Sequence, residues 1–194
     1  MSSLTHAEST VVGSSPEALY DMVADVSRTG EWSPICKTCW WDEGESAREG
    51  AWFTGRNQLP ERSWETRSQV VVADRGREFA FVVGGSYVRW GFTFAPVEGG
   101  TLVTESWEFL PDGIAMFFNR YGKEAQQRIT DRTREAHEGI PATLAAIKRI
   151  AERESFTSTW RSQSSWPSPV VRMPQRPTDE CQSNGRLLER EPAV

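Results

Sequence analysis

The spacing of apolar residues changes once along this chain, from every second position to every third or fourth. Over residues 65–110 nearly every second residue is large and apolar, and glycine-rich turns separate the runs. After Pro111 the apolar residues recur at helical spacing as far as Ala151. Alternation indicates strands with one buried face, and the longer spacing indicates a helix with one buried stripe. An antiparallel sheet covered by one helix can enclose a cavity, so a small-molecule pocket is the first functional hypothesis.

Turn residues divide the chain before the long helix into strands and two short helices. The first strand, over residues 4–12, precedes a helix that begins with Ser15 as a cap and Pro16 at its first position. A second helical segment over 27–33 ends at Pro34. Clusters of Asp and Gly delimit the remaining strands, at 36–42, 51–59, 63–73, 78–83, 87–96 and 101–110. Short turns between consecutive strands predict one antiparallel sheet, completed by the first strand.

The long helix is predicted over residues 118–153, and the composition changes beyond it. Pro141 lies within this range, and the apolar stripe stays in phase across it, which predicts a kink rather than a break. The end of the chain has no sustained period and holds five of the eleven prolines. We therefore predict a folded domain over 1–154 and a disordered tail over 155–194. A docking peptide at 164–171 is the alternative for this tail.

Charge and composition argue against several classes of function. The formal net charge is −5 and no cationic cluster is visible, so no nucleic-acid partner is expected. No stretch approaches the roughly 18 apolar residues of a membrane span, and the N-terminus lacks the features of a secretion signal. A cytoplasmic protein is therefore expected. There is no GxGxxG motif after a strand and no P-loop, so no nucleotide cofactor is expected.

A metal site and a nucleophilic triad are also not expected. Cys36 and Cys39 form a CxxC motif, but residues three apart on a strand face opposite sides, and no second pair accompanies them. Cys181 lies in the predicted tail. The histidines are His6, in an end expected to fray, and His137, on the solvated side of the helix.

Several segments, taken in their order along the chain, resemble the SRPBCC superfamily, which includes START-like and Bet v 1-like proteins. These segments are residues 15–26, 31–34, 50–57, 76–81, 90–94 and 100–108. The resemblance covers about residues 4–153 and is nearest to the bacterial polyketide cyclase/dehydrase and lipid-transport branch. It implies an α+β helix-grip fold, in which a curved seven-stranded antiparallel sheet surrounds a long C-terminal helix and two short helices follow the first strand.

Glu105 is the candidate catalytic residue. It is the one charged residue on an otherwise apolar strand face. A carboxylate there loses hydration, which raises its pKa unless it is paired. The functional interpretation is an acid that anchors or protonates a ligand. The alternatives are a structural carboxylate paired with an arginine such as Arg56, or a face misassigned because of a bulge.

The apolar strand faces and the helix stripe supply the candidate ligand-binding residues. An amide such as that of Asn57 can fix a ligand carbonyl or hydroxyl. Aromatic side chains can stack on a ligand, although aromatic stripes are more often ordinary core. The candidates are Trp32, Phe53, Asn57, Phe81, Trp90, Phe92, Trp107, Tyr121 and Ile129.

These observations predict a protein that binds a small hydrophobic ligand, lipid-like or polyketide-like, between sheet and helix. No cofactor, metal, nucleic-acid partner or membrane span is expected. The alternative is an enzyme of the polyketide cyclase/dehydratase type that uses Glu105 as general acid or base. Whether a reaction is catalysed, and the oligomeric state, stay open at the level of sequence.

Overall fold

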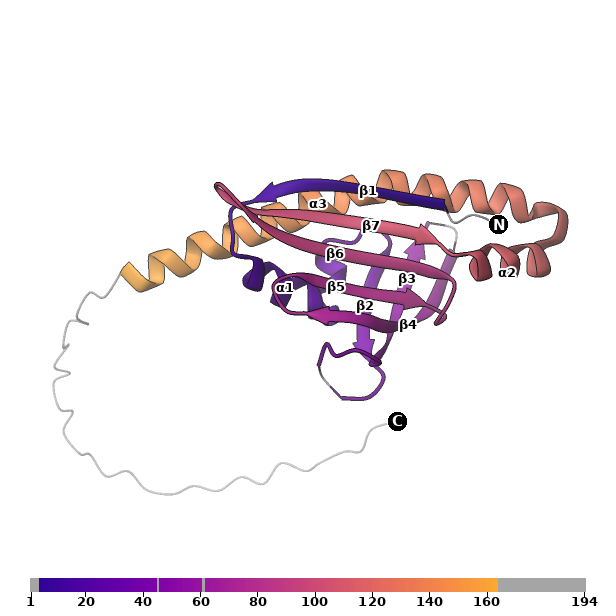
Figure 1. Cartoon of the computed structure of the whole chain (residues 1–194), viewed down its shortest axis with the longest axis horizontal. Helices are drawn as coiled ribbons and strands as arrows, with labels where there is room; N and C mark the ends of the chain where they lie inside the picture. Colours follow the sequence, from indigo (N-terminus) through magenta and orange to yellow (C-terminus); the bar gives the residue numbers. More distant parts are fainter. Residues whose placement is uncertain (1–3, 45, 61, 164–194) are drawn as a thin grey trace, which may run out of the picture. The chain divides into compact units, whose positions relative to one another are not determined.

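The structure, a computed structural model, describes residues 4–44, 46–60 and 62–163. Its described strands form one antiparallel sheet with the order β1-β7-β6-β5-β4-β3-β2 (Figure 1). The strands are β1 (Leu4–Val12), β2 (Cys36–Trp41), β3 (Trp52–Leu59), β4 (Arg62–Asp74), β5 (Glu78–Val83), β6 (Val88–Val97) and β7 (Gly100–Phe109). The helices are α1 (Pro16–Ala24), η1 (Val26–Glu31), α2 (Pro111–Tyr121), η2 (Gly122–Glu124) and α3 (Ala125–Gln163). The predicted helix-grip fold is confirmed.

The first strand completes the sheet beside the last one. β1 pairs with β7 over its full length, from Leu4 opposite Phe109 to Val12 opposite Thr101. The hydroxyl of Thr101 donates a hydrogen bond of 2.7 Å to the carbonyl of Ser14, which ties the exit of β1 to the start of β7. The next residue, Ser15, caps α1 as predicted, because its hydroxyl accepts from the backbone N–H of Ala18.

The helical region differs from the prediction of one helix over 118–153. Pro111 occupies the first turn of a separate helix, α2, where its missing N–H costs nothing. Gly122 then adopts a φ of 53°, a value that favours glycine and ends the helix. The second helix, α3, continues through Pro141 and ends at Gln163. Residues 155–163 are therefore helical, and the rest of the predicted tail lies outside the described residues.

The long helix α3 packs along β1 and β7 (Figure 1). Its residues Ile140 and Ile147 are fully buried, as is Val12 of β1. Full burial of one such aliphatic side chain stabilises the fold by about 1.5–3 kcal/mol. The buried stripe of α3 therefore holds the helix on this edge of the sheet. None of the described helices is long and apolar enough to cross a membrane.

Two β-bulges change the side to which residues point. One lies in β4 between Val70 and Val72, and the other lies in β2 between Cys36 and Thr38. An extra residue in one strand shifts the alternation, so every later side chain moves to the opposite face. The bulge in β2 affects a motif that carries chemistry, as described below.

Candidate functional site

A cavity of about 540 Å³ is enclosed by the sheet, α2 and α3. Residues of the strands β2 to β7 supply about half of its wall, and the helices, the loop over residues 32–35 and the turn before β6 supply the remainder. The wall is mainly apolar and rich in aromatic rings. These aromatic residues are Trp32, Phe53, Trp64, Phe79, Phe81, Tyr87, Trp90, Phe92, Trp107, Phe109, Phe117 and Tyr121.

The structure brings almost all of the candidate site residues together at this cavity. The lining includes Glu105, Trp32, Phe53, Asn57, Phe81, Trp90, Phe92, Trp107 and Tyr121. Ile129 is buried in the hydrophobic core and is not among the lining residues. The apolar stripe of α3 packs against the rest of the core, and Ala136 of this stripe, with Gly139 and Thr143 beside it, lines the cavity.

The carboxyl group of Glu105 is buried in the cavity wall. The residue is 4% exposed, and no described residue forms a hydrogen bond with its Oε2 atom. Burial removes the water that would stabilise a carboxylate, and this raises the pKa of Glu105 well above its usual range. On the neighbouring strands, Phe92 and Glu8 lie opposite it, and Glu8 is exposed and contacts His6. Glu105 therefore keeps its proton to a higher pH than an exposed glutamate does, and its Oε2 has no hydrogen-bond partner among the described residues.

Neither specific alternative for Glu105 agrees with the structure. Arg56 is exposed and pairs instead with Glu65, at 2.8 Å between Nη2 and Oε1. The register of β7 with β1 and with β6 is unbroken, so no bulge changes the face of Glu105. The carboxyl group points into the cavity side of the sheet because the alternation of β7 places it there.

Asn57 reaches the same cavity from β3. Its side-chain amide donates to the hydroxyl of Thr66 at 3.1 Å and to the carbonyl of Gly55 at 3.4 Å. These bonds hold the amide in one orientation, with its donors used within the wall. Asn57 therefore offers an oxygen acceptor, and Glu105 offers an acidic donor, to anything held in the cavity.

A charged cluster at the cavity was not identified from the sequence. Arg132 and Glu135 of α3 form an ion pair, and Glu135 also accepts from Arg62 at 3.2 Å. Both guanidinium groups lie over the ring of Trp64, at 4.5 Å for Arg62 and 5.2 Å for Arg132. Arg132 and Glu135 lie three residues apart, which places them on one helix face, next to the predicted apolar stripe. That spacing is the signal that could have identified them.

The prediction that Cys36 and Cys39 face opposite sides of their strand was wrong. The sulfur atoms of Cys36 and Cys39 are 3.2 Å apart, and both residues line the cavity. The bulge between Cys36 and Thr38 adds one residue to β2, so the two cysteines share a face. Among the described residues no group of three or more His, Cys, Asp or Glu side chains could hold a metal ion.

The two histidines stack on each other, which the sequence did not indicate. His6 is held in β1 rather than in a frayed end, and its ring lies 3.8 Å from that of His137 on α3. His137 is exposed, as predicted, and neither histidine lines the cavity. A triad of nucleophile, histidine and carboxylate at the cavity is not formed by the described residues.

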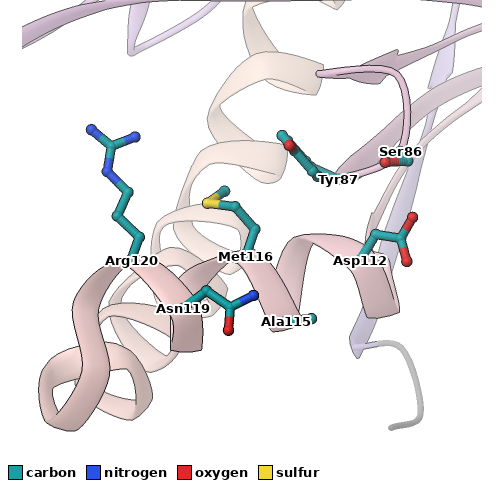
Figure 2. A pocket seen from close by; sticks show the side chains of 7 residues that line it. All are labelled: Ser86, Tyr87, Asp112, Ala115, Met116, Asn119 and Arg120. Atoms are coloured by element: carbon teal, nitrogen blue, oxygen red, sulfur yellow. The ribbon is translucent and has the colours of Figure 1, made fainter.

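A second hollow lies outside the cavity, between α2 and the turn that precedes β6. Figure 2 shows Met116 and Arg120 along α2, with Tyr87 on the turn beside them. Its lining residues are Ser86, Tyr87, Asp112, Ala115, Met116, Asn119 and Arg120. Most of its α2 residues are exposed, so it is an open depression. It shares Tyr87, Met116 and Arg120 with the cavity and marks the outer side of the cavity rim.

Comparisons with known proteins agree with this architecture. The family described as "Polyketide cyclase / dehydrase and lipid transport" matches residues 4–138. The Polyketide_cyc-like protein Cgl2372 from Corynebacterium glutamicum, solved by NMR, is 42% identical, and the match covers 85% of this chain and 98% of that one with a TM-score of 0.60. No curated protein sequence matches the chain.

More distant solved structures share the fold. The di-domain ARO/CYC protein StfQ from the steffimycin biosynthetic pathway is 14% identical, over 79% of this chain and 52% of that one, with a TM-score of 0.62. SA2116 from Staphylococcus aureus, a protein of unknown function, is 13% identical, over 80% and 97% of the two chains, with a TM-score of 0.60. At these identities the likeness concerns the fold alone.

Proposed function

Because the chain belongs to the polyketide cyclase/dehydrase and lipid transport family, we propose that it binds a small hydrophobic ligand in the cavity beneath the sheet. The observation that carries the proposal is an aromatic cavity of about 540 Å³ with a buried carboxyl whose Oε2 has no partner among the described residues. This volume lies within the range of about 300–1,000 Å³ typical of small-molecule sites. The ligand class is lipid-like or polyketide-like.

The wall and the polar groups have different roles in this proposal. The aromatic rings supply affinity by burying the apolar surface of the ligand. Glu105, when protonated, donates a hydrogen bond to an oxygen of the ligand, because no described residue is bonded to its Oε2. The proposed ligand is therefore mostly apolar, and it carries at least one carbonyl or hydroxyl oxygen.

Filling the cavity is expected to weaken binding. Thr66→Trp places an indole ring in the space that the ligand requires, because Thr66 lines the cavity. We expect the affinity for anilinonaphthalene sulfonate, measured by fluorescence titration, to fall by about tenfold or more, which corresponds to about 1.4 kcal/mol. Thr93→Trp is the matched control, because Thr93 is exposed on the other face of β6. Equal affinities for the two variants would contradict the cavity as the binding site.

The natural ligand is best sought in the protein as purified. Native mass spectrometry of freshly prepared protein is expected to show a bound species that is lost on denaturation and absent from Thr66→Trp. An apolar molecule with an oxygen substituent would support the ligand class proposed here. A bound species that survives the substitution would place the ligand elsewhere.

A second candidate function is a cyclase or dehydratase reaction, and one observation favours it. Glu105 is buried, its pKa is raised by burial, and its Oε2 has no partner among the described residues, which are the properties of a general acid. In such a reaction the protonated carboxyl gives its proton to a ligand oxygen, either a carbonyl that gains negative charge or a hydroxyl that leaves as water. The printed name of StfQ, an ARO/CYC protein of a biosynthetic pathway, is consistent with chemistry on this fold.

Glu105→Gln distinguishes binding from catalysis. The amide keeps the shape of the side chain and its hydrogen bonding but cannot donate an acidic proton. The substrate for this test is the species that native mass spectrometry identifies. If Glu105 is the general acid, kcat for this substrate should fall by about 10²–10⁴-fold, while its affinity changes by less than about tenfold. Unchanged kcat would exclude Glu105 as the acid, and loss of affinity with no turnover in the wild type would restrict Glu105 to binding.

A further inference from the structure

Two thiols meet in the wall of the cavity, and the proposed ligand function does not involve them. The Sγ atoms of Cys36 and Cys39 are in contact at 3.2 Å. The register explains this contact, because Cys36 lies opposite Asn57 and Cys39 lies opposite Gly55. Asn57 and Gly55 are two apart on one face of β3, so the two cysteines are neighbours along one face of β2.

The backbone already places the two cysteines within reach of a disulfide bond. Their partners Asn57 and Gly55 are two positions apart on β3, which corresponds to about 6.5 Å along a strand, and the bulge gives the two cysteines a matching separation. Disulfides occur for Cα separations of about 4.4–6.8 Å. A bond between the two sulfurs therefore requires only that they approach each other, and the sheet need not rearrange. The local bulge supplies this geometry, because without it the side chains of Cys36 and Cys39 would point to opposite faces.

Gly55 provides the room that the sulfur pair occupies. A Cβ atom at position 55 would lie 3.1 Å from Sγ of Cys39 and 3.3 Å from Sγ of Cys36. Both distances are shorter than an ordinary van der Waals contact. A side chain at this position would therefore compete with both sulfurs.

The pair is reachable from the cavity, and its hydrogen bonds favour one thiolate. Both cysteines line the cavity. Arg120, which also lines it, is exposed, so the cavity is open to solvent on that side. The sulfurs of Cys36 and Cys39 are hydrogen-bonded to each other, and the thiol of Cys36 also lies 3.6 Å from the carbonyl of Thr38. The hydroxyl of Thr29 donates to the sulfur of Cys39. The bond between the sulfurs and the bond from Thr29 lower the pKa of Cys39, and the first of them raises the pKa of Cys36. Cys39 is thus the attacking sulfur, and Cys36 is the resolving sulfur.

We propose that Cys36 and Cys39 form a redox-active dithiol, which closes to an intramolecular disulfide by exchange with a low-molecular-weight disulfide. The Cys39 thiolate attacks one sulfur of the small disulfide, which releases one small thiolate and leaves a mixed disulfide. Cys36 then loses its proton and attacks Sγ of Cys39, which releases the second small thiolate. Two protein thiols are oxidised, one small disulfide is reduced, and a thiol reductant reverses both steps.

The test uses the full chain with Cys181→Ser, which leaves Cys36 and Cys39 as its cysteines. The reduced protein is incubated with oxidised glutathione, and its free thiols and intact mass are measured with time. We expect both thiols to disappear, the mass to fall by two hydrogen atoms, no glutathione to remain attached, and dithiothreitol to restore both thiols. Peptide mapping should place the bond between residues 36 and 39.

A matched control moves one sulfur to the other face of the strand. Thr38 is exposed and lies opposite Arg56, so Thr38→Cys combined with Cys39→Ser and Cys181→Ser keeps two cysteines but separates them. This variant should retain mixed disulfides with glutathione and form no intramolecular bond. A Cys181→Ser protein that keeps both thiols, or that ends as a stable mixed disulfide, would overturn the proposal. Equal ring closure in the control would also overturn it, because the bulge would then be irrelevant.

Discussion

Glu105→Gln is expected to make the protein more stable than the wild type, by an amount that grows as the pH rises. The reason is the cost of keeping a carboxyl group protonated in the cavity wall. In the unfolded chain Glu105 loses its proton near the ordinary glutamate pKa, whereas burial raises its pKa in the folded protein. Glutamine has no proton to lose, so it removes this cost while keeping the size of the side chain.

The direction of the pH dependence follows from proton linkage. Between the unfolded and the folded pKa of Glu105, the folded state holds more protons than the unfolded state, so the free energy of unfolding falls as the pH rises. The wild type should therefore lose about 1.4 kcal/mol per pH unit relative to Glu105→Gln over this interval. The difference begins near the ordinary pKa of glutamate and levels off above the raised pKa.

Urea unfolding of both proteins from pH 4 to pH 9 measures this difference. At the acid end the two proteins should have similar free energies of unfolding. Glu98→Gln is the matched control, because it makes the same substitution at an exposed position in the turn after β6. Its effect should stay within about 0.5 kcal/mol at every pH. A constant difference between Glu105→Gln and the wild type would contradict the neutral acid.

Phe109→Ala is expected to destabilise the protein by about 3–5 kcal/mol. Phe109 is 1% exposed, and its ring packs against Trp107 and Phe117, with centroids 6.0 and 5.1 Å away. Truncation removes the ring from the junction of β7 and α2 and enlarges the cavity that Phe109 lines. A loss of this size is a large part of the roughly 5–15 kcal/mol by which domains are usually stable.

The same substitution on the surface provides the comparison. Phe156 of α3 is 66% exposed, so Phe156→Ala should change the free energy of unfolding by no more than about 0.5 kcal/mol. Both variants can be measured by urea unfolding at pH 6. A small loss for Phe109→Ala would mean that α2 closes onto the space left by the ring, and the cavity would then be smaller than in the wild type.

The sequence predicted the sheet and its inward face because β-strand alternation is a local property. Phe53, Phe81, Trp90, Phe92 and Trp107 were assigned to the cavity side from alternation alone, and the structure places all of them in the cavity wall. Phe81 lies beside the bulge of β4, opposite Val70, but its own strand β5 carries no extra residue. The other four residues pair without a bulge at their positions. For such strands, the two-residue period of the sequence is sufficient to assign each side chain to a face of the sheet.

The sequence predictions were wrong mainly where a single residue changes the path of the backbone. The bulge after Cys36 reverses the face of Cys39, and nothing in the apolar pattern of that short strand marks it. Gly122 divides the predicted helix because its positive φ turns the chain between two segments with continuous apolar spacing. Ile129 belongs to the correct stripe but packs in the core, because the position of α3 on the sheet is set by tertiary contacts.

The pairing of the first strand with the last has a consequence for how the protein is made. β1 emerges first during synthesis, but its partner β7 ends at Phe109, so this edge of the sheet stays open until most of the domain exists. Pairings between residues so distant in sequence are slow to form, because a long loop must close first. α3 packs on β1 and β7, so the wall of the cavity is complete only after this pairing. On the proposed function, the ligand binds only completed molecules and draws the folding equilibrium toward them.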